Sequence, residues 1–270
     1  MKKRLFASTL AIALLFFLAS CGNGSEESNS GKDSPLTEKE VEELYATPEK
    51  FKGRSVEILG VVFSEPERDG DGIYFQMWAD PVNSEKNTVV SSSDSDLKLH
   101  DGDYVKIVGT VGKPFKGETL LGEKITAPTI FADSVDVVTY QEAVAPAIAT
   151  YEFSDLSQTQ LGYTVSIKKV ELAERETRVY VNVQNHGSAA FSLYSFDCKI
   201  VQDGKQYDEE SNFDADYPEI QSDLQVGAST DGIICFDQIN NSDFKIVFEA
   251  GSDNWDETIN PYTFDVVLNQ

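Results

Sequence analysis

The sequence predicts a mainly β protein with two folded modules, a small barrel followed by an antiparallel sandwich. From about residue 55 onward, apolar and polar residues alternate over short runs, and turn residues such as Gly and Asp separate these runs. A chain of 270 residues has room for two small domains. With 40% hydrophobic and 25% charged residues, the composition is ordinary for a globular protein.

The first twenty residues predict export. Met1-Lys2-Lys3-Arg4 is basic, and an apolar stretch runs from Leu5 to Leu18. A basic start followed by a short apolar stretch and small residues is typical of a secretory signal peptide, and the stretch is too short for a comfortable transmembrane helix.

The end of this segment, Leu18-Ala19-Ser20-Cys21, resembles the bacterial lipobox. The resemblance implies that Cys21 receives diacylglycerol, becomes the mature N-terminus and holds the lipoprotein in the bilayer through acyl chains such as palmitate. Two or more acyl chains make such anchoring stable. The expected location is therefore the extracytoplasmic face of the cell membrane. The alternative is an ordinary signal peptide that ends at a cysteine by chance.

A tether is predicted at residues 21–36. The segment is rich in Gly, Ser and Asn and carries almost no apolar side chains. It cannot bury enough surface to fold, so we expect a flexible link between the lipid and the first domain.

The first domain is predicted at residues 37–140. Thr37-Glu38-Lys39-Glu40 fits a capping box, and Val41 and Leu44 follow at helical spacing, so we expect a helix up to about residue 50. Period-two patterns then predict five strands, which suit a small barrel. The strands are expected at Ser55–Phe63, Gly72–Ala79, Asn87–Ser91, Tyr104–Val111 and Ile130–Thr139.

Two runs of this domain carry a family resemblance. The run from Leu44 to Val62 and the run from Leu99 to Val111, which contains Gly102-Asp103-Tyr104-Val105, resemble the anticodon-binding-like OB-fold domain of bacterial surface proteins. The resemblance implies an OB-like barrel whose ligand is generally unknown.

Nucleic acid is an unlikely ligand for this barrel. OB-folds that bind single strands combine aromatic platforms with a positive groove, whereas residues 37–140 hold 11 Lys and Arg against 20 Asp and Glu. The aromatic residues Tyr74, Phe75 and Trp78 are a weak candidate for a ligand face. The alternative is that one side of this strand is core and the other is ordinary surface.

A joint of small residues is predicted at 141–150, before a second domain at 151–270. Period-two patterns and turn signals here predict about seven strands, which suit an antiparallel sandwich. The strands are expected at Tyr163–Leu172, Arg178–Asn185, Ala190–Leu193, Ser195–Val201, Thr230–Phe236, Phe244–Glu249 and Tyr262–Leu268.

This second half is similar to the immunoglobulin-like domain of unknown function that recurs in lipoproteins of Gram-positive bacteria. The matching runs are Gly162–Val165, Val181–Ser188, Asp203–Tyr207 and Leu224–Phe236, although Val226 stands where the family usually has Pro. The resemblance implies an Ig-like sandwich with a binding or adhesion-like role and no known catalysis.

Few residues are candidates for chemistry. His100 and His186, the only histidines, both lie in turn contexts, which favours exposed loop residues over a catalytic or zinc site. Cys198 and Cys235 remain once Cys21 is lipidated, and an even pair in an exported protein permits a disulfide. Two buried free thiols are the alternative.

Calcium is a candidate ligand of the second domain. From Gln206 to Phe244 there is no Lys or Arg, and acidic loops of secreted modules bind calcium weakly through carboxylate oxygens. The turn Asp69-Gly70-Asp71-Gly72 is a second, weaker candidate, and the alternative for both is a solubilising acidic surface. The candidate ligands in the second domain are Asp208, Glu209, Glu210, Asp214, Asp216 and Asp223.

These patterns predict a non-enzymatic binding or interaction module at the cell surface, whose ligand is a surface protein or a glycan. No Rossmann or P-loop glycine pattern opens a helix, and no catalytic residues stand out. An accessory enzyme or inhibitor acting on envelope glycans near Trp78 is the alternative function. The net charge of -24 makes binding to nucleic acid unlikely, because phosphate backbones are repelled.

Overall fold

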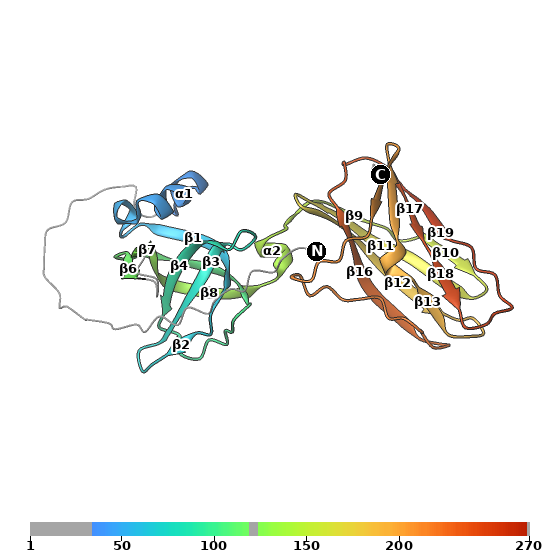
Figure 1. The fold of residues 1–270 in the computed structure, drawn as a ribbon, viewed down its shortest axis with the longest axis horizontal. Coiled ribbons are helices and arrows are strands. Elements are labelled where there is room, and N and C mark those ends of the chain that lie inside the picture. The colour runs from blue at the N-terminus through green and yellow to red at the C-terminus, as the bar shows by residue number, and fades with distance from the viewer. Residues whose placement is uncertain (1–33, 119–123, 269–270) are drawn as a thin grey trace, which may run out of the picture. The chain divides into compact units, whose positions relative to one another are not determined.

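The computed structural model describes residues 34–118 and 124–268, and it divides the chain into two compact units (Figure 1). The first unit ends at Thr139 and the second begins at Tyr140. The predicted signal peptide, Cys21 and all but the last three residues of the predicted tether lie outside the described residues. No helix within the described ranges is both long and apolar enough to cross a membrane.

Two short helices open the first unit. They are α1 (Glu38–Ala46) and a 3₁₀ turn, η1 (Pro48–Phe51). The predicted capping box is confirmed, because the Thr37 hydroxyl accepts the Glu40 amide at 3.4 Å and the Glu40 carboxylate accepts the Thr37 amide at 2.9 Å. Leu44 is fully buried, so α1 packs its apolar stripe onto the barrel.

Five strands close into an OB-like barrel, as predicted. Each neighbour pair is antiparallel except β4 with β8, and β1 pairs with both β3 and β5, which closes the ring. Two accessory pairs extend it: β2 (Glu67–Arg68) beside β3, and the hairpin of β6 (Phe115–Glu118) and β7 (Lys124–Ala127). The barrel strands are β1 (Ser55–Val62), β3 (Ile73–Asp80), β4 (Glu85–Ser92), β5 (Tyr104–Val111) and β8 (Thr129–Val138).

The second unit is an antiparallel sandwich, as predicted. Its first sheet carries β10, β11, β12 and β16 in that order, with β9 also paired to β11, and its second sheet carries β15, β14, β17 and β19. A short pair, β13 with β18, completes it. The strands are β9 (Ala147–Glu152), β10 (Ser157–Gln160), β11 (Tyr163–Ala173), β12 (Glu176–Asn185), β13 (Phe191–Leu193), β14 (Lys199–Gln202), β15 (Lys205–Asp208), β16 (Ser229–Asp237), β17 (Phe244–Phe248), β18 (Ala250–Ser252) and β19 (Tyr262–Val266).

One predicted strand is partly wrong. Residues 195–201 were expected to form a single strand, but they form a 3₁₀ turn, η2 (Ser195–Asp197), before β14 begins. The amide of Asp197 donates to the carbonyl of Tyr194 at 3.0 Å, and this bond turns the chain. Ser and Asp favour such turns, whereas the apolar Phe196 between them is 75% exposed and does not mark a buried strand position.

The expected joint at 141–150 is part of the sandwich. It contains most of the short helix α2 (Tyr140–Ala143) and the first residues of β9, which pairs with β11 from Ala147 to Glu152. Ala145 is fully buried. Ala145 is thus the residue of this segment that packs closely within the sandwich, whereas Ala147 and Ile148 are exposed.

Candidate functional site

The outer side of strand β3 is the candidate binding face of the barrel. Side chains along β3 alternate, so that Ile73, Phe75 and Met77 are buried in the core, while the side chains between them lie on the outer surface. The predicted ligand face of Tyr74, Phe75 and Trp78 is therefore corrected. Phe75 is only 4% exposed and belongs to the core, whereas Tyr74 and Trp78 share the outer face with Gln76.

An aromatic stack lies at one end of this face. The ring of Trp78 stacks on Phe63 with ring centroids 4.0 Å apart and planes 18° apart, and both side chains are half-buried. Strands β1 and β3 approach closely here, because a Cβ added at Gly60 would lie 2.5 Å from the carbonyl oxygen of Trp78. Gly60 thus allows the strand pairing that supports the stack.

Neutral polar groups and a further aromatic residue continue the face. Asn87 lies opposite Trp78 in the pairing of β3 with β4, and its amide donates to the Gln76 side-chain oxygen at 3.2 Å. On β8, Phe131 is 56% exposed and lies beside Ser91, which is itself opposite Tyr74. We define the barrel face as six residues: Phe63, Tyr74, Gln76, Trp78, Asn87 and Phe131.

The electrostatic setting of the barrel face is neutral with an acidic border. Burial, followed by the nearby carboxylates of Asp69 and Asp71, raises the pKa of Tyr74 above its ordinary value. In the turn Asp69-Gly70-Asp71-Gly72, the Asp69 carboxylate accepts the amides of Asp71 and Gly72 at 2.8 Å and 3.2 Å, which is an Asx turn. Aromatic faces flanked by neutral amides suit stacking and hydrogen bonding to an uncharged ligand.

The acidic segment of the sandwich, which we define as residues 206–244, forms no metal cluster. Within the described ranges, no three His, Cys, Asp or Glu side chains come together in a way that could hold a metal ion. Several of the candidate ligands already serve protein contacts: Glu209 accepts Ser211 at 2.7 Å, Asp208 accepts Gln206 at 2.7 Å and Asp223 accepts Ser192 at 3.2 Å. Glu210, Asp214 and Asp216 lie further along the same segment.

The two histidines are exposed, and the two cysteines of the sandwich are buried. The side chain of His100 is 70% exposed, and His186 is exposed in the turn after β12. Cys198 and Cys235 are buried free thiols, which is the second of the two alternatives that the sequence left open. Burial raises the pKa of the Cys235 thiol to about 12, and burial likewise raises the pKa of Cys198.

A buried ionic cluster around Arg178 was not predicted from the sequence. Arg178 on β12 is 1% exposed, and its guanidinium donates to Glu171 at 2.8 Å, to Glu176 at 2.7 Å and to the carbonyl of Ala145 at 2.8 Å. Tyr217 from the acidic segment also donates to Glu176. The cluster thus fastens the segment that carries α2 and the acidic segment to the same sheet.

Hydrogen bonding favours the charged forms of Arg178 and Glu171. Burial acts to lower the pKa of Arg178, but the bonds to Glu176 and Glu171 outweigh it and raise that pKa. Burial acts to raise the pKa of Glu171, but the bonds from Lys169, Tyr180 and Arg178 outweigh it and lower that pKa. The only sequence signal was a basic residue between acidic ones in a strand pattern, which usually indicates a solvated face.

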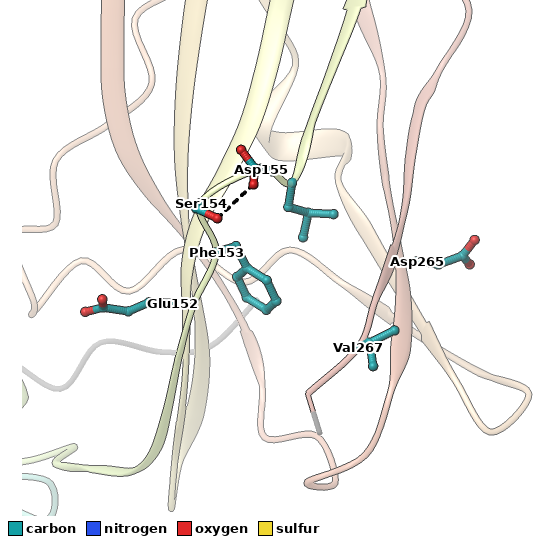
Figure 2. Close-up of a pocket in the computed structure, with 7 residues that line it drawn as sticks. Glu152, Phe153, Ser154, Asp155, Asp265 and Val267 are labelled. Carbon is teal, nitrogen blue, oxygen red and sulfur yellow. Dashed lines mark hydrogen bonds between the residues drawn. The ribbon is translucent and has the colours of Figure 1, made fainter. Parts of the chain in front are cut away.

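A shallow pocket of about 320 Å³ lies at the edge of the sandwich. Phe153, Leu156 and Val267 supply its apolar wall, and carboxylates stand around it. Figure 2 shows that Asp265 points away from Phe153 and that Asp155 is held by Ser154, at 3.0 Å. Asp265 also pairs with Lys245 at 2.7 Å. Because the carboxylates around it do not converge, the pocket offers no paired acid and base.

Neither a protein-family model nor a curated protein matches the chain. The resemblances to an anticodon-binding-like OB-fold domain and to an immunoglobulin-like lipoprotein domain therefore stay predictions.

Proposed function

We propose that this chain is a lipid-anchored extracytoplasmic binding module whose barrel face binds an uncharged stretch of an envelope glycan. The single observation that carries the ligand class is the stack of Trp78 on Phe63 beside the amide pair of Gln76 and Asn87. Sugar rings present C–H faces that pack on aromatic rings. Their hydroxyls form hydrogen bonds with side-chain amides, which are uncharged and can both donate and accept.

The charge of the barrel favours a neutral ligand over nucleic acid. Residues 37–140 hold 11 basic and 20 acidic side chains, so a phosphate backbone would meet net repulsion. The lipobox at Leu18–Cys21 supports the anchored location. An outward location places the barrel where wall and surface glycans are found.

Fluorescence of Trp78 tests the glycan proposal directly. The chain has two tryptophans, so the Trp255→Phe variant leaves Trp78 as the only reporter. Titration with soluble peptidoglycan strands and neutral wall polysaccharide should give a saturable change in emission. Gln76→Ala should weaken binding about tenfold, because it removes one polar contact from a desolvated site. The matched control is Gln206→Ala, on an exposed strand of the sandwich.

Two results would overturn the proposal. If the emission of Trp78 does not change with any of these glycans, glycans are not the ligands of the barrel face. Chromatography of the glycan after incubation should show intact chains, and shorter products would favour the alternative of an accessory enzyme.

The anchor is tested separately by Cys21→Ala. Cell fractionation should move the protein out of the membrane fraction, because the acyl chains can no longer be attached. A variant that stays in the membrane fraction with unchanged gel mobility would show that Cys21 is not the lipid attachment point.

A further inference from the structure

One end of the sandwich presents large apolar side chains at three separate turns. Leu161, between β10 and β11, is 55% exposed, and Val226, before β16, is 57% exposed. Trp255, in the loop between β18 and β19, is 98% exposed. We call these three residues, with His186 between them, the loop end of the sandwich.

Hydrogen bonds fasten these loops to one another. The amide of His186 donates to the carbonyl of Gly162 at 2.9 Å, and the amide of Gly227 donates to the carbonyl of Asn185 at 2.7 Å. The turns that carry Leu161 and Val226 therefore lie on either side of the turn after β12. The loop end is a single surface built from neighbouring segments.

The loop that carries Trp255 is held to the same turn. The carboxylate of Glu257 accepts bonds from Ser188 at 2.6 Å, from Ser252 at 2.6 Å and from Tyr163 at 2.8 Å. These bonds join the loop to β11, to the turn after β12 and to the end of β18. Trp255 is thus presented on a fixed support, which lowers the entropy that a partner must remove on binding.

The residue types at these turns are not the ones that turn geometry favours. Leu161 has a φ of +51°, a left-handed conformation that costs a residue other than Gly about 1 kcal/mol or more. Asn or Gly would occupy that position with less strain, and a polar residue would serve at Val226 and Trp255. Single exposed apolar residues are ordinary, but three on one surface form a patch of the kind that marks an interface.

Charge identifies the kind of partner. The four segments that form the loop end, residues 157–164, 184–192, 223–230 and 251–261, contain no Lys or Arg. Three exposed carboxylates stand among the apolar side chains: Asp223, Asp253 and Asp256. An anionic membrane and a second copy of this acidic domain would both be repelled, whereas a surface with Lys or Arg around an apolar groove would be attracted.

We infer that the loop end of the sandwich is a docking surface for a basic protein partner, with Trp255 and Leu161 inserted into an apolar groove that Lys and Arg side chains surround. Aromatic residues in such positions commonly dominate the binding energy, and carboxylates at the rim guide association. This surface is distinct from the barrel face, so the inference does not depend on the proposed glycan ligand.

Peptide selection tests the inference. The full chain, purified in mild detergent, is panned against a phage-displayed library of random dodecapeptides, and enriched peptides are synthesised for titration. We expect sequences that combine Lys or Arg with large apolar residues. Trp255→Ser should weaken their binding at least about tenfold. Raising the salt from about 50 mM to about 500 mM should weaken binding severalfold, because the charges at the rim are screened.

Phe213→Ser is the matched control. Phe213 is also a nearly fully exposed aromatic residue, at 91%, but it lies in the acidic segment, near the Arg178 end of the sheet, and should leave peptide binding unchanged. Thermal unfolding of both variants should match that of the parent chain, because both side chains are exposed. Changed unfolding would mark a folding defect, and Leu161→Asn, which also relieves the left-handed strain, then provides the decisive variant.

Three results would overturn the inference. If no peptide is enriched, or if the enriched peptides lack basic residues, the partner is not a basic protein. If Trp255→Ser and Phe213→Ser weaken peptide binding equally, the loop end is not the specific docking surface. Analytical ultracentrifugation that shows a dimer broken by Trp255→Ser would make the occupant a second copy of this chain.

Discussion

Arg178 is a single residue on which two distant segments depend. Its guanidinium neutralises two buried carboxylates and also satisfies the carbonyl of Ala145. Replacing a fully paired buried cluster with apolar groups is often neutral, whereas removing one partner leaves uncompensated charge. The side chains around Arg178 therefore stabilise the sandwich only while the arginine is present.

Arg178→Met should strongly destabilise the sandwich. The change leaves Glu171 and Glu176 buried without their shared cation, so we expect a loss of about 3–5 kcal/mol in the free energy of unfolding. Urea denaturation followed by circular dichroism measures it. Arg175→Met, at an exposed position three residues earlier, is the control and should change stability by less than about 0.5 kcal/mol. If the two changes lower the free energy of unfolding equally, the buried cluster around Arg178 does not contribute specifically to stability.

The buried thiols of Cys198 and Cys235 should be unreactive in the folded protein. Because burial raises the pKa of Cys235 to about 12, the reactive thiolate is scarce at pH 8. Titration of the Cys21→Ala variant with a chromogenic disulfide reagent should show no fast-reacting group in the native protein and two in denaturant without reductant. Finding no thiol in denaturant would mean that Cys198 and Cys235 are joined by a disulfide.

At the scale of elements, strands with one buried face were predictable and polar edge strands were not. Period two located β1, β5 and β8 within a residue or two, because each has one face in the core. The edge strand β10, Ser-Gln-Thr-Gln, has no apolar residue to mark a face, and its pairing with β11 depends on tertiary context.

In the candidate site, too, the sequence pattern could predict which side chains of one strand are buried, but it could not predict contacts between strands. Period two already separates Phe75 from Tyr74 and Trp78, so its place in the core could have been predicted from the sequence alone. The stack of Trp78 on Phe63 could not, because it depends on the close pairing of β1 with β3. The loop end could not be predicted either, because its turns come from segments as much as 100 residues apart in the sequence, as the bond from Gln160 to Asn260 shows.

The loop between β18 and β19 should respond to acid through Glu257. Hydrogen bonds from Ser188, Ser252 and Tyr163 lower the pKa of Glu257 from its ordinary 4.5 to about 2. A carboxyl whose pKa is lower in the folded state stabilises the fold above pH 4.5, and this contribution is lost as the pH falls from 4.5 to 2.

Glu257→Gln should therefore flatten the pH dependence of stability in that window. Thermal unfolding at intervals from pH 6 to pH 2.5 compares the variant with the parent chain. Glu174→Gln, on an exposed turn, is the control and should keep the parent profile. An unchanged slope in Glu257→Gln would mean that the bonds seen at this carboxylate contribute nothing to folding.

At the scale of the whole molecule, each unit contains its own core. One cluster of buried apolar residues is formed by α1, η1 and the barrel strands, and the other by the two sheets of the sandwich. The acidic charge is unevenly divided between them, with a net of -9 over residues 37–140 and the larger share beyond. A net charge far from zero favours solubility and biases encounters toward basic partners.

The boundary between the two units decides which fragment folds alone. The sequence placed the start of the sandwich at residue 151, but α2, Ala145 and most of β9 lie before that point and are bonded to the sheet. A fragment of residues 140–270 should unfold cooperatively with the stability of the sandwich in the full chain. A fragment of residues 151–270 should be less stable by at least about 2 kcal/mol, because Arg178 loses a buried acceptor and β11 loses most of its pairing with β9. Urea denaturation of the two fragments side by side measures the difference, and equal stabilities would place the boundary at residue 151 after all.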